Sequence, residues 1–168
     1  QKLIRAYKKL ISLGLNRGTS GNCSVRLEGG GKFLITPSGV PLEKMTPACI
    51  VQMGLDGLVD GDGKPSSEWR FHRDIMKNRP DVQAIVHTHS VAATALACLR
   101  QDIPSFHYMV AVAGGDSIRC SPYALFGTQE LSDGVLQALE GRKVCLMANH
   151  GVIALGRDVH EAIQIAQE

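Results

Sequence analysis

Residues 82–90, VQAIVHTHS, form an apolar run that ends in two histidines one residue apart. The run predicts a strand over residues 82–88, in which side chains at i and i+2 leave the same face. His87 and His89 would then project in parallel and could chelate one zinc ion. They could equally be two polar residues on the solvent face of the strand, so the choice depends on the rest of the chain.

The surrounding sequence predicts an α/β fold in one domain. Helical spacing or helix-start signals indicate helices over residues 2–15 (with Gly14 as the stop), 66–79, 90–100, 128–141 and 158–168. A hairpin is expected over 22–27 and 31–36, a short helical turn running into a strand over 46–53, and two strands turning at Asn149–Gly151 within 143–155. No repeat or linker interrupts residues 1–168, so we expect a single domain with a central mixed or antiparallel sheet flanked by helices.

Composition excludes several classes of function. Eighteen Lys and Arg residues against sixteen Asp and Glu residues leave a net charge of +2, which argues against a nucleic-acid partner but allows small phosphate groups. No apolar stretch approaches about 18 residues, so no membrane span is expected. The five cysteines are scattered, with no CxxC pair, which fits a reducing cytoplasm. The chain ends while still helical, so we expect that the tail of a longer protein is missing.

Two further residues could complete a metal site. His150 lies in the turn NHG, where it could be a ligand or a hydrogen-bonded turn residue. Glu68 follows PSS at the start of a helix, where a carboxylate is also favoured by the helix dipole alone. Three histidines and one displaceable carboxylate would form an open catalytic zinc site, because neutral ligands keep the metal a strong Lewis acid.

Three segments of small residues could hold phosphate. GTSGN (18–22), TPSG (36–39) and PSS (65–67) combine hydroxyls with turns or a helix start. Backbone N–H groups and hydroxyls gathered in this way bind phosphate without lysine, although each segment alone is also ordinary turn chemistry. None of them matches a Walker A or a Rossmann fingerprint.

The order of six motifs resembles a known family. GTSGNCSVR, TPSG, SSEWRFH, VHTHS, IPSFHYMVAVAGG and NHG follow one another as in the class II zinc aldolases of sugar phosphates, from about residue 3 to the end of the chain. Within that family, the chain looks most like the enzymes that act on L-fuculose 1-phosphate. The resemblance implies a lyase that yields dihydroxyacetone phosphate and L-lactaldehyde through a metal-stabilised enediolate.

The resemblance also implies roles for particular residues. His87, His89 and His150 match the three ligands of one zinc ion per subunit. Glu68 matches a general acid/base that can also approach the metal, and Tyr108 matches a tyrosine that reaches the active site of a neighbouring subunit in a homotetramer. The positions that match the family's phosphate site, with Asn22 also near the enediolate, are Gly21, Asn22, Ser38, Gly39, Ser66 and Ser67.

Other interpretations stay open at this point. Within the superfamily, the alternatives are another ketose-phosphate aldolase or a pentulose 5-phosphate 4-epimerase. Outside enzymes, the alternative is an adducin-like assembly domain, which would lack the zinc histidines. As a general acid/base, Glu68 would work best with a raised pKa, which desolvation beside Trp69 could produce. His72, one helical turn after Glu68, could orient that glutamate or simply pack in or on its helix.

Overall fold

The computed structural model describes residues 1–168 and is built on one mixed sheet of eight strands. The strand order is β4-β3-β2-β1-β5-β8-β7-β6, and every neighbouring pair is antiparallel except β6 and β7. The strands are β1 (Asn22–Arg26), β2 (Lys32–Ile35), β3 (Val51–Gly54), β4 (Val59–Asp60), β5 (Ala84–Thr88), β6 (Arg119–Ser121), β7 (Val144–Met147) and β8 (Gly151–Gly156). The expected fold class, α/β with a mixed central sheet, is confirmed.

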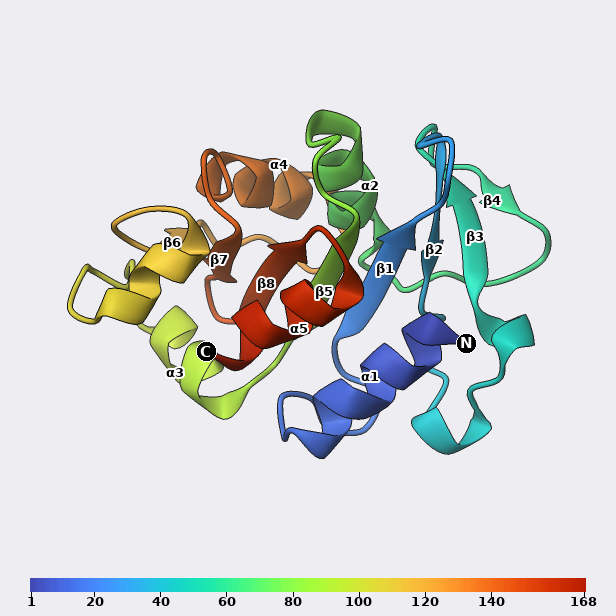
Figure 1. Ribbon diagram of the computed structural model, residues 1–168, viewed down its shortest axis with the longest axis horizontal. Helices are drawn as coiled ribbons and strands as arrows, with labels where there is room; N and C mark the ends of the chain where they lie inside the picture. Colours follow the sequence, from blue (N-terminus) through green and yellow to red (C-terminus); the bar gives the residue numbers. More distant parts are fainter.

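Helices cover both faces of this sheet (Figure 1). One apolar cluster joins one face of the central strands to α1, α3 and α5, and a second joins the other face to α2 and α4. The α-helices are α1 (Lys2–Ser12), α2 (Trp69–Asn78), α3 (Val91–Cys98), α4 (Gln129–Ala138) and α5 (Val159–Gln167). The 3-10 helices are η1 (Leu42–Lys44), η2 (Pro47–Cys49) and η3 (Tyr108–Ala113).

The alternation of β5 decides which residues meet. Ala84 and Val86 belong to the cluster under α1, α3 and α5, whereas Ile85 belongs to the cluster under α2 and α4. Because successive strand side chains point to opposite faces, His87 lies on the face of Ile85, toward α2. The fully buried β5 therefore presents a histidine to the helix that follows Glu68.

Most expected elements are present, with two differences. The helix expected from residue 66 begins at Trp69, and Glu68 is its N-cap residue, because the backbone of Glu68 is not yet helical. The serines still contribute to this start, since Ser66 Oγ accepts from the Glu68 N–H at 3.3 Å. Two short strands, β4 and β6, lie in stretches for which the sequence predicted neither a helix nor a strand.

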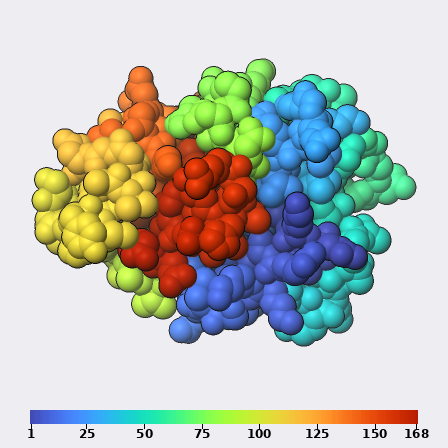
Figure 2. Space-filling model, viewed as in Figure 1, coloured from blue at the N-terminus to red at the C-terminus, as the bar shows by residue number.

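The segment that contains η3 projects at one end of the molecule. Figure 2 shows this segment, in yellow, on the opposite side of α5 from β3 and β4. Several of its large apolar side chains are exposed, among them Phe106 and Tyr108. None of the helices is long and apolar enough to cross a membrane. All five cysteines are free thiols, and two of them, Cys23 and Cys145, are buried.

Candidate metal centre and active site

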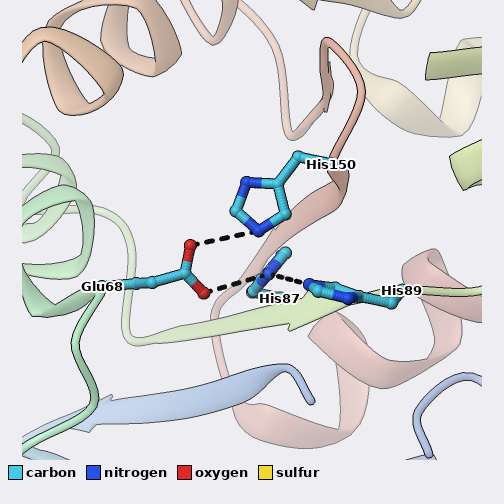
Figure 3. A group of neighbouring side chains, drawn as sticks. All are labelled: Glu68, His87, His89 and His150. Carbon is cyan, nitrogen blue, oxygen red and sulfur yellow. Dashed lines mark hydrogen bonds and ion pairs between the residues drawn. The ribbon is translucent and has the colours of Figure 1, made fainter. Parts of the chain in front are cut away.

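Four side chains converge where β5, the β7–β8 turn and the start of α2 meet. Glu68 is the N-cap of α2, His87 is in β5, His89 follows β5 by one residue, and His150 lies in the turn before β8. One possible ligand atom from each lies within 4.8 Å of the others. Figure 3 shows the carboxylate of Glu68 and the three imidazoles pointing toward one another. The two histidines of VHTHS do share a face, as expected.

The hydrogen bonds of His87 fix which of its nitrogens carries the proton. Its Nδ1 lies 3.0 Å from the carbonyl oxygen of Val152, which can only accept, so Nδ1–H is the donor. The Nε2 of neutral His87 then has a lone pair. That atom lies 3.2 Å from Glu68 Oε2 and 2.8 Å from His89 Nε2. Lone pairs held this close need either the hydrogen of a hydrogen bond or a metal ion between them.

His150 and Glu68 repeat this pattern. His150 Nε2 lies 3.2 Å from Glu68 Oε1, yet that oxygen is buried and has no hydrogen-bond partner, because the angles at this contact are poor for a hydrogen bond. Burial lowers the pKa of His89 and of His150 to about 4, so both imidazoles are neutral near pH 7. Neutral imidazoles and an orphaned carboxylate oxygen are what a divalent metal ion needs, so the residues fit a metal.

The expected rise in the pKa of Glu68 is wrong for this arrangement. Burial does raise it, but His87, His150 and the amide of Asn22 together outweigh burial and lower the pKa to about 2. The side chain is therefore an anion near neutral pH. The ring of Trp69, which was expected to desolvate the carboxylate, packs against the guanidinium groups of Arg70 and Arg73.

A pocket of about 340 Å³ opens over this cluster. Glu68, His89 and His150 line it, whereas His87 is fully buried. All six positions expected at the phosphate line the same pocket: Gly21, Asn22, Ser38, Gly39, Ser66 and Ser67. No lysine or arginine is among the lining residues. The three small-residue segments, which are far apart in the sequence, are thus brought together with the metal cluster.

One side of the pocket was missed by sequence reasoning. Tyr123, Ala124, Phe126 and Asn149 also line the pocket. The first three lie in the irregular stretch between η3 and α4, which has no periodicity from which their position could be predicted. Asn149 stands next to His150 with a positive φ of 57°. Asn149 lay inside the quoted motif NHG, and Thr19 and Ser20, which line the pocket near Gly21, lay inside GTSGN, although no role was assigned to any of the three.

The glycine of GTSGN has a specific packing reason. Gly21 has a φ of 68°, and a Cβ on it would lie 2.3 Å from the amide of Asn16. The space it leaves is occupied by the buried Asn16 side chain, whose Oδ1 accepts from the His89 N–H at 3.0 Å. Gly21 therefore permits a contact that holds the backbone of a candidate ligand.

Tyr108 does not join this pocket. It begins η3, its side chain is 80% exposed, and it borders a separate shallow pocket with Phe106 and His107. Tyr108 could therefore act only at the metal cluster of a neighbouring chain.

The family of the chain follows from comparison with known proteins. The model of the class II aldolase and adducin N-terminal domain matches residues 1–168. The chain belongs to this family. A solved structure of L-fuculose 1-phosphate aldolase superposes with a TM-score of 0.95 at 42% identity, covering 99% of this chain and 79% of that one.

Two curated relatives carry different names. The 5-methylthioribulose-1-phosphate/5-deoxyribulose-1-phosphate aldolase of Rhodospirillum rubrum is 55% identical over 166 residues, which are 99% of this chain and 74% of the relative. The L-fuculose phosphate aldolase of Escherichia coli K12 is 47% identical over 174 aligned residues, which span 100% of this chain and 77% of the relative. Both are aldolases, so the chain is a class II aldolase, a lyase that acts on a small phosphosugar.

Proposed function

We propose that this aldolase is zinc-dependent, with one ion per subunit, and cleaves L-fuculose 1-phosphate to dihydroxyacetone phosphate and L-lactaldehyde. The observation that carries the proposal is the convergence of Glu68, His87, His89 and His150 under a hydroxyl-lined pocket. Three imidazoles and one carboxylate are typical zinc ligands, and a carboxylate that substrate can displace leaves an open position. Residues 1–168 would form one catalytic domain.

The hydroxyl-rich part of the pocket would hold the phosphate group of the substrate. Ser66 and Ser67 directly precede Glu68, the N-cap of α2, and both line the pocket. Gly21 and Gly39, both with a φ of 68°, stand beside Asn22 and Ser38. Because glycine has no side chain, the backbone of these two turns stays accessible. Backbone amides and hydroxyls arranged in this way bind phosphate without a lysine.

The reaction breaks the bond between C3 and C4 of a ketose 1-phosphate. When bound, the metal supplies a positive charge beside the oxygen on which negative charge develops. Tyr108 of a neighbouring subunit would accept the proton of the C4 hydroxyl while passing its own phenol proton on to solvent. Glu68, protonated from solvent once substrate has displaced it, would supply the proton that C3 of the enediolate gains. To hold this proton, the carboxylate must be separated by the bound substrate from the two histidines that lower its pKa.

A second substrate is favoured by the relative at 55% identity, whose name includes 5-deoxyribulose 1-phosphate. Both candidate sugars carry phosphate on C1 and end in a methyl group, so they differ only in the aldehyde half. Tyr123, Ala124 and Phe126 give the pocket an apolar side that suits such an end. The metal cluster argues against an adducin-like assembly domain, which needs no such ligands.

We also propose a homotetramer in the cytoplasm, with active sites at subunit interfaces. The support is the exposure of Tyr108 outside the pocket of its own chain, together with the exposed Phe106 beside it. Exposed apolar and aromatic side chains that form a patch on a surface commonly mark a site of interaction with another protein.

Cleavage of a panel of ketose 1-phosphates tests the function, with coupled detection of dihydroxyacetone phosphate. The panel holds L-fuculose 1-phosphate, 5-deoxyribulose 1-phosphate, 5-methylthioribulose 1-phosphate and a pentulose 5-phosphate. We expect the highest kcat/KM with L-fuculose 1-phosphate. A preference for either ribulose derivative would replace the substrate and keep the reaction. Absence of cleavage together with epimerisation of the 5-phosphate would contradict the proposal.

A further inference from the structure

Four buried side chains form a hydrogen-bonded line that leads away from the metal cluster. Glu68 Oε2 accepts from Asn22 Nδ2 at 2.9 Å, Asn22 Oδ1 is bonded to His72 Nε2, and His72 Nδ1 lies 2.7 Å from Ser24 Oγ. The exposed fraction is 0% for His72 and Ser24 and no more than 6% for Asn22 and Glu68. His72 does not line the pocket over the metal cluster, and its two hydrogen bonds go to Asn22 and Ser24 rather than to a candidate metal ligand.

The chemistry of these groups gives the line one direction. The carboxylate of Glu68 accepts, so Asn22 must turn its NH₂ group toward it and its carbonyl oxygen toward His72. A carbonyl oxygen can only accept, so His72 must carry its hydrogen on Nε2. The lone pair of Nδ1 is then left to accept from the hydroxyl of Ser24. Each group in the line thus donates toward Glu68.

Packing alone does not explain a histidine at this position. Burial lowers the pKa of His72 to about 3, so the ring is neutral, and its neighbour Phe71 shows that the same core accepts a purely apolar ring. A buried imidazole without partners would cost free energy, whereas this ring satisfies both nitrogens. The two bonds join α2 to β1, and one of them ends on Asn22, which donates to the candidate ligand Glu68.

We propose that His72 is a positioning residue that holds the amide of Asn22 with its NH₂ group toward Glu68. Without the Nε2–H of His72, the amide can turn over and place its oxygen against the carboxylate, which repels it. The inference rests on the proposed role of Glu68 in proton transfer. Its consequence is a loss of turnover rather than a loss of metal, because the ligands themselves keep their contacts.

Two substitutions of similar polarity separate this role from packing. In His72→Gln, the side-chain nitrogen lies near the position of Nε2 and can still donate to Asn22. In His72→Asn, the shorter side chain reaches toward Ser24 but not toward Asn22. We expect His72→Asn to lower kcat by about 10–100-fold, the usual cost of losing an outer hydrogen-bond partner. His72→Gln should restore most of kcat, and both variants should keep one metal ion per chain.

Equal kcat in the two variants, whether reduced or not, would overturn the inference, as would loss of metal in His72→Asn alone. A second measurement needs no substrate. In zinc-loaded protein with ¹⁵N-labelled histidine, we expect His72 as the Nε2–H tautomer, identified by the signal missing from His72→Gln. An Nδ1–H tautomer or an imidazolium would also overturn it. Failure of the wild-type protein to cleave any ketose 1-phosphate would instead refute the proposed function, while the tautomer still tests the hydrogen-bonded line.

Discussion

At the scale of the residue, Asn16 holds the two histidines of VHTHS through their backbone. Strand β1 begins at Asn22, opposite His87, so the sheet offers no partner to the N–H of His89. Asn16 supplies it: Oδ1 accepts from His89 N–H at 3.0 Å, and Nδ2 lies 3.5 Å from the His87 carbonyl oxygen. One side chain thus fixes the backbone on both sides of Thr88.

We predict that Asn16→Ala weakens metal binding by about 10–100-fold, the usual range for an outer hydrogen-bond partner of a metal site. The ligands remain, but the backbone that aims two of them is no longer held. Competition with a zinc chelator measures the loss. Asn78→Ala is the matched control, because Asn78 also bonds a backbone carbonyl but at the far end of α2. An affinity equal to wild type in Asn16→Ala would refute this role.

Sequence reasoning finds residues of this kind only in part. The spacing of His87 and His89 predicts chelation because alternation along a strand is a local property. The contacts of Asn16 with His89 and of His72 with Asn22 span 73 and 50 residues, so no local pattern indicates them. The expectation of a raised pKa for Glu68 was wrong for the same reason. Its burial could be inferred from the sequence, but the two imidazoles that lower the pKa come from distant segments.

At the scale of the element, the end of β5 lies against the start of β8. Gly151 opens β8 directly after His150, and a Cβ there would stand 2.4 Å from the carbonyl oxygen of Thr88. It would also stand 3.2 Å from ring atoms of His87 and of His89. The absence of a side chain at this position is therefore what lets the three histidines converge.

We predict that Gly151→Ala lowers the free energy of unfolding by about 1–3 kcal/mol, as overpacking does, and reduces metal content. Gly134→Ala is the matched control within α4, where a Cβ would meet nothing closer than 3.6 Å. That control should instead stabilise the protein by about 0.4–1 kcal/mol, because alanine restricts the unfolded chain. Urea unfolding and metal analysis measure both. Equal behaviour of the two variants would contradict the close approach.

Elements with strong local signals were predictable, and short ones were not. Thr128 caps α4 and Asp158 caps α5 as the sequence indicates, since each side chain accepts from a backbone N–H three residues later. Strand β6 has three residues and exists because β7 offers it a parallel partner, which is a tertiary effect. The start of α2 was placed too early because Ser66 and Ser67 look like caps while Glu68 takes that position.

At the scale of the whole molecule, stability should depend on pH through one buried histidine, His72, and two half-buried ones, His89 and His150. In the folded protein, burial lowers the pKa of His72 to about 3 and those of His89 and His150 to about 4, from 6.5. Between these values the unfolded chain binds more protons than the folded chain. The free energy of unfolding of the metal-free protein should therefore fall as the pH falls from about 6.5 to about 4.

Urea unfolding of metal-free protein across this range measures the effect. His72→Gln should make the decline shallower, since it removes one of the three groups. A free energy of unfolding that stays constant or rises on acidification to about pH 5 would contradict the burial of neutral histidines.

Assembly can be tested by mixing two inactive chains. Tyr108→Phe and Glu68→Gln should each be nearly inactive alone, because each lacks one proton-transfer group. In a randomly mixed cyclic tetramer, a site that pairs an intact Glu68 with an intact neighbouring Tyr108 arises about one time in four. Co-expression should therefore restore about a quarter of wild-type turnover. Mixed tetramers that stay inactive would show that Tyr108 does not act across an interface.

The central claim is that the cluster of Glu68 and three histidines holds a catalytic metal. Zinc content and cleavage rate of the same preparations test it most directly, in wild type, His89→Ala and Glu68→Gln. We expect about one zinc per chain in wild type, loss of zinc and activity in His89→Ala, and retained zinc with about 10²–10⁴-fold slower turnover in Glu68→Gln. Full cleavage activity in chelator-treated, metal-free wild-type protein would contradict the account.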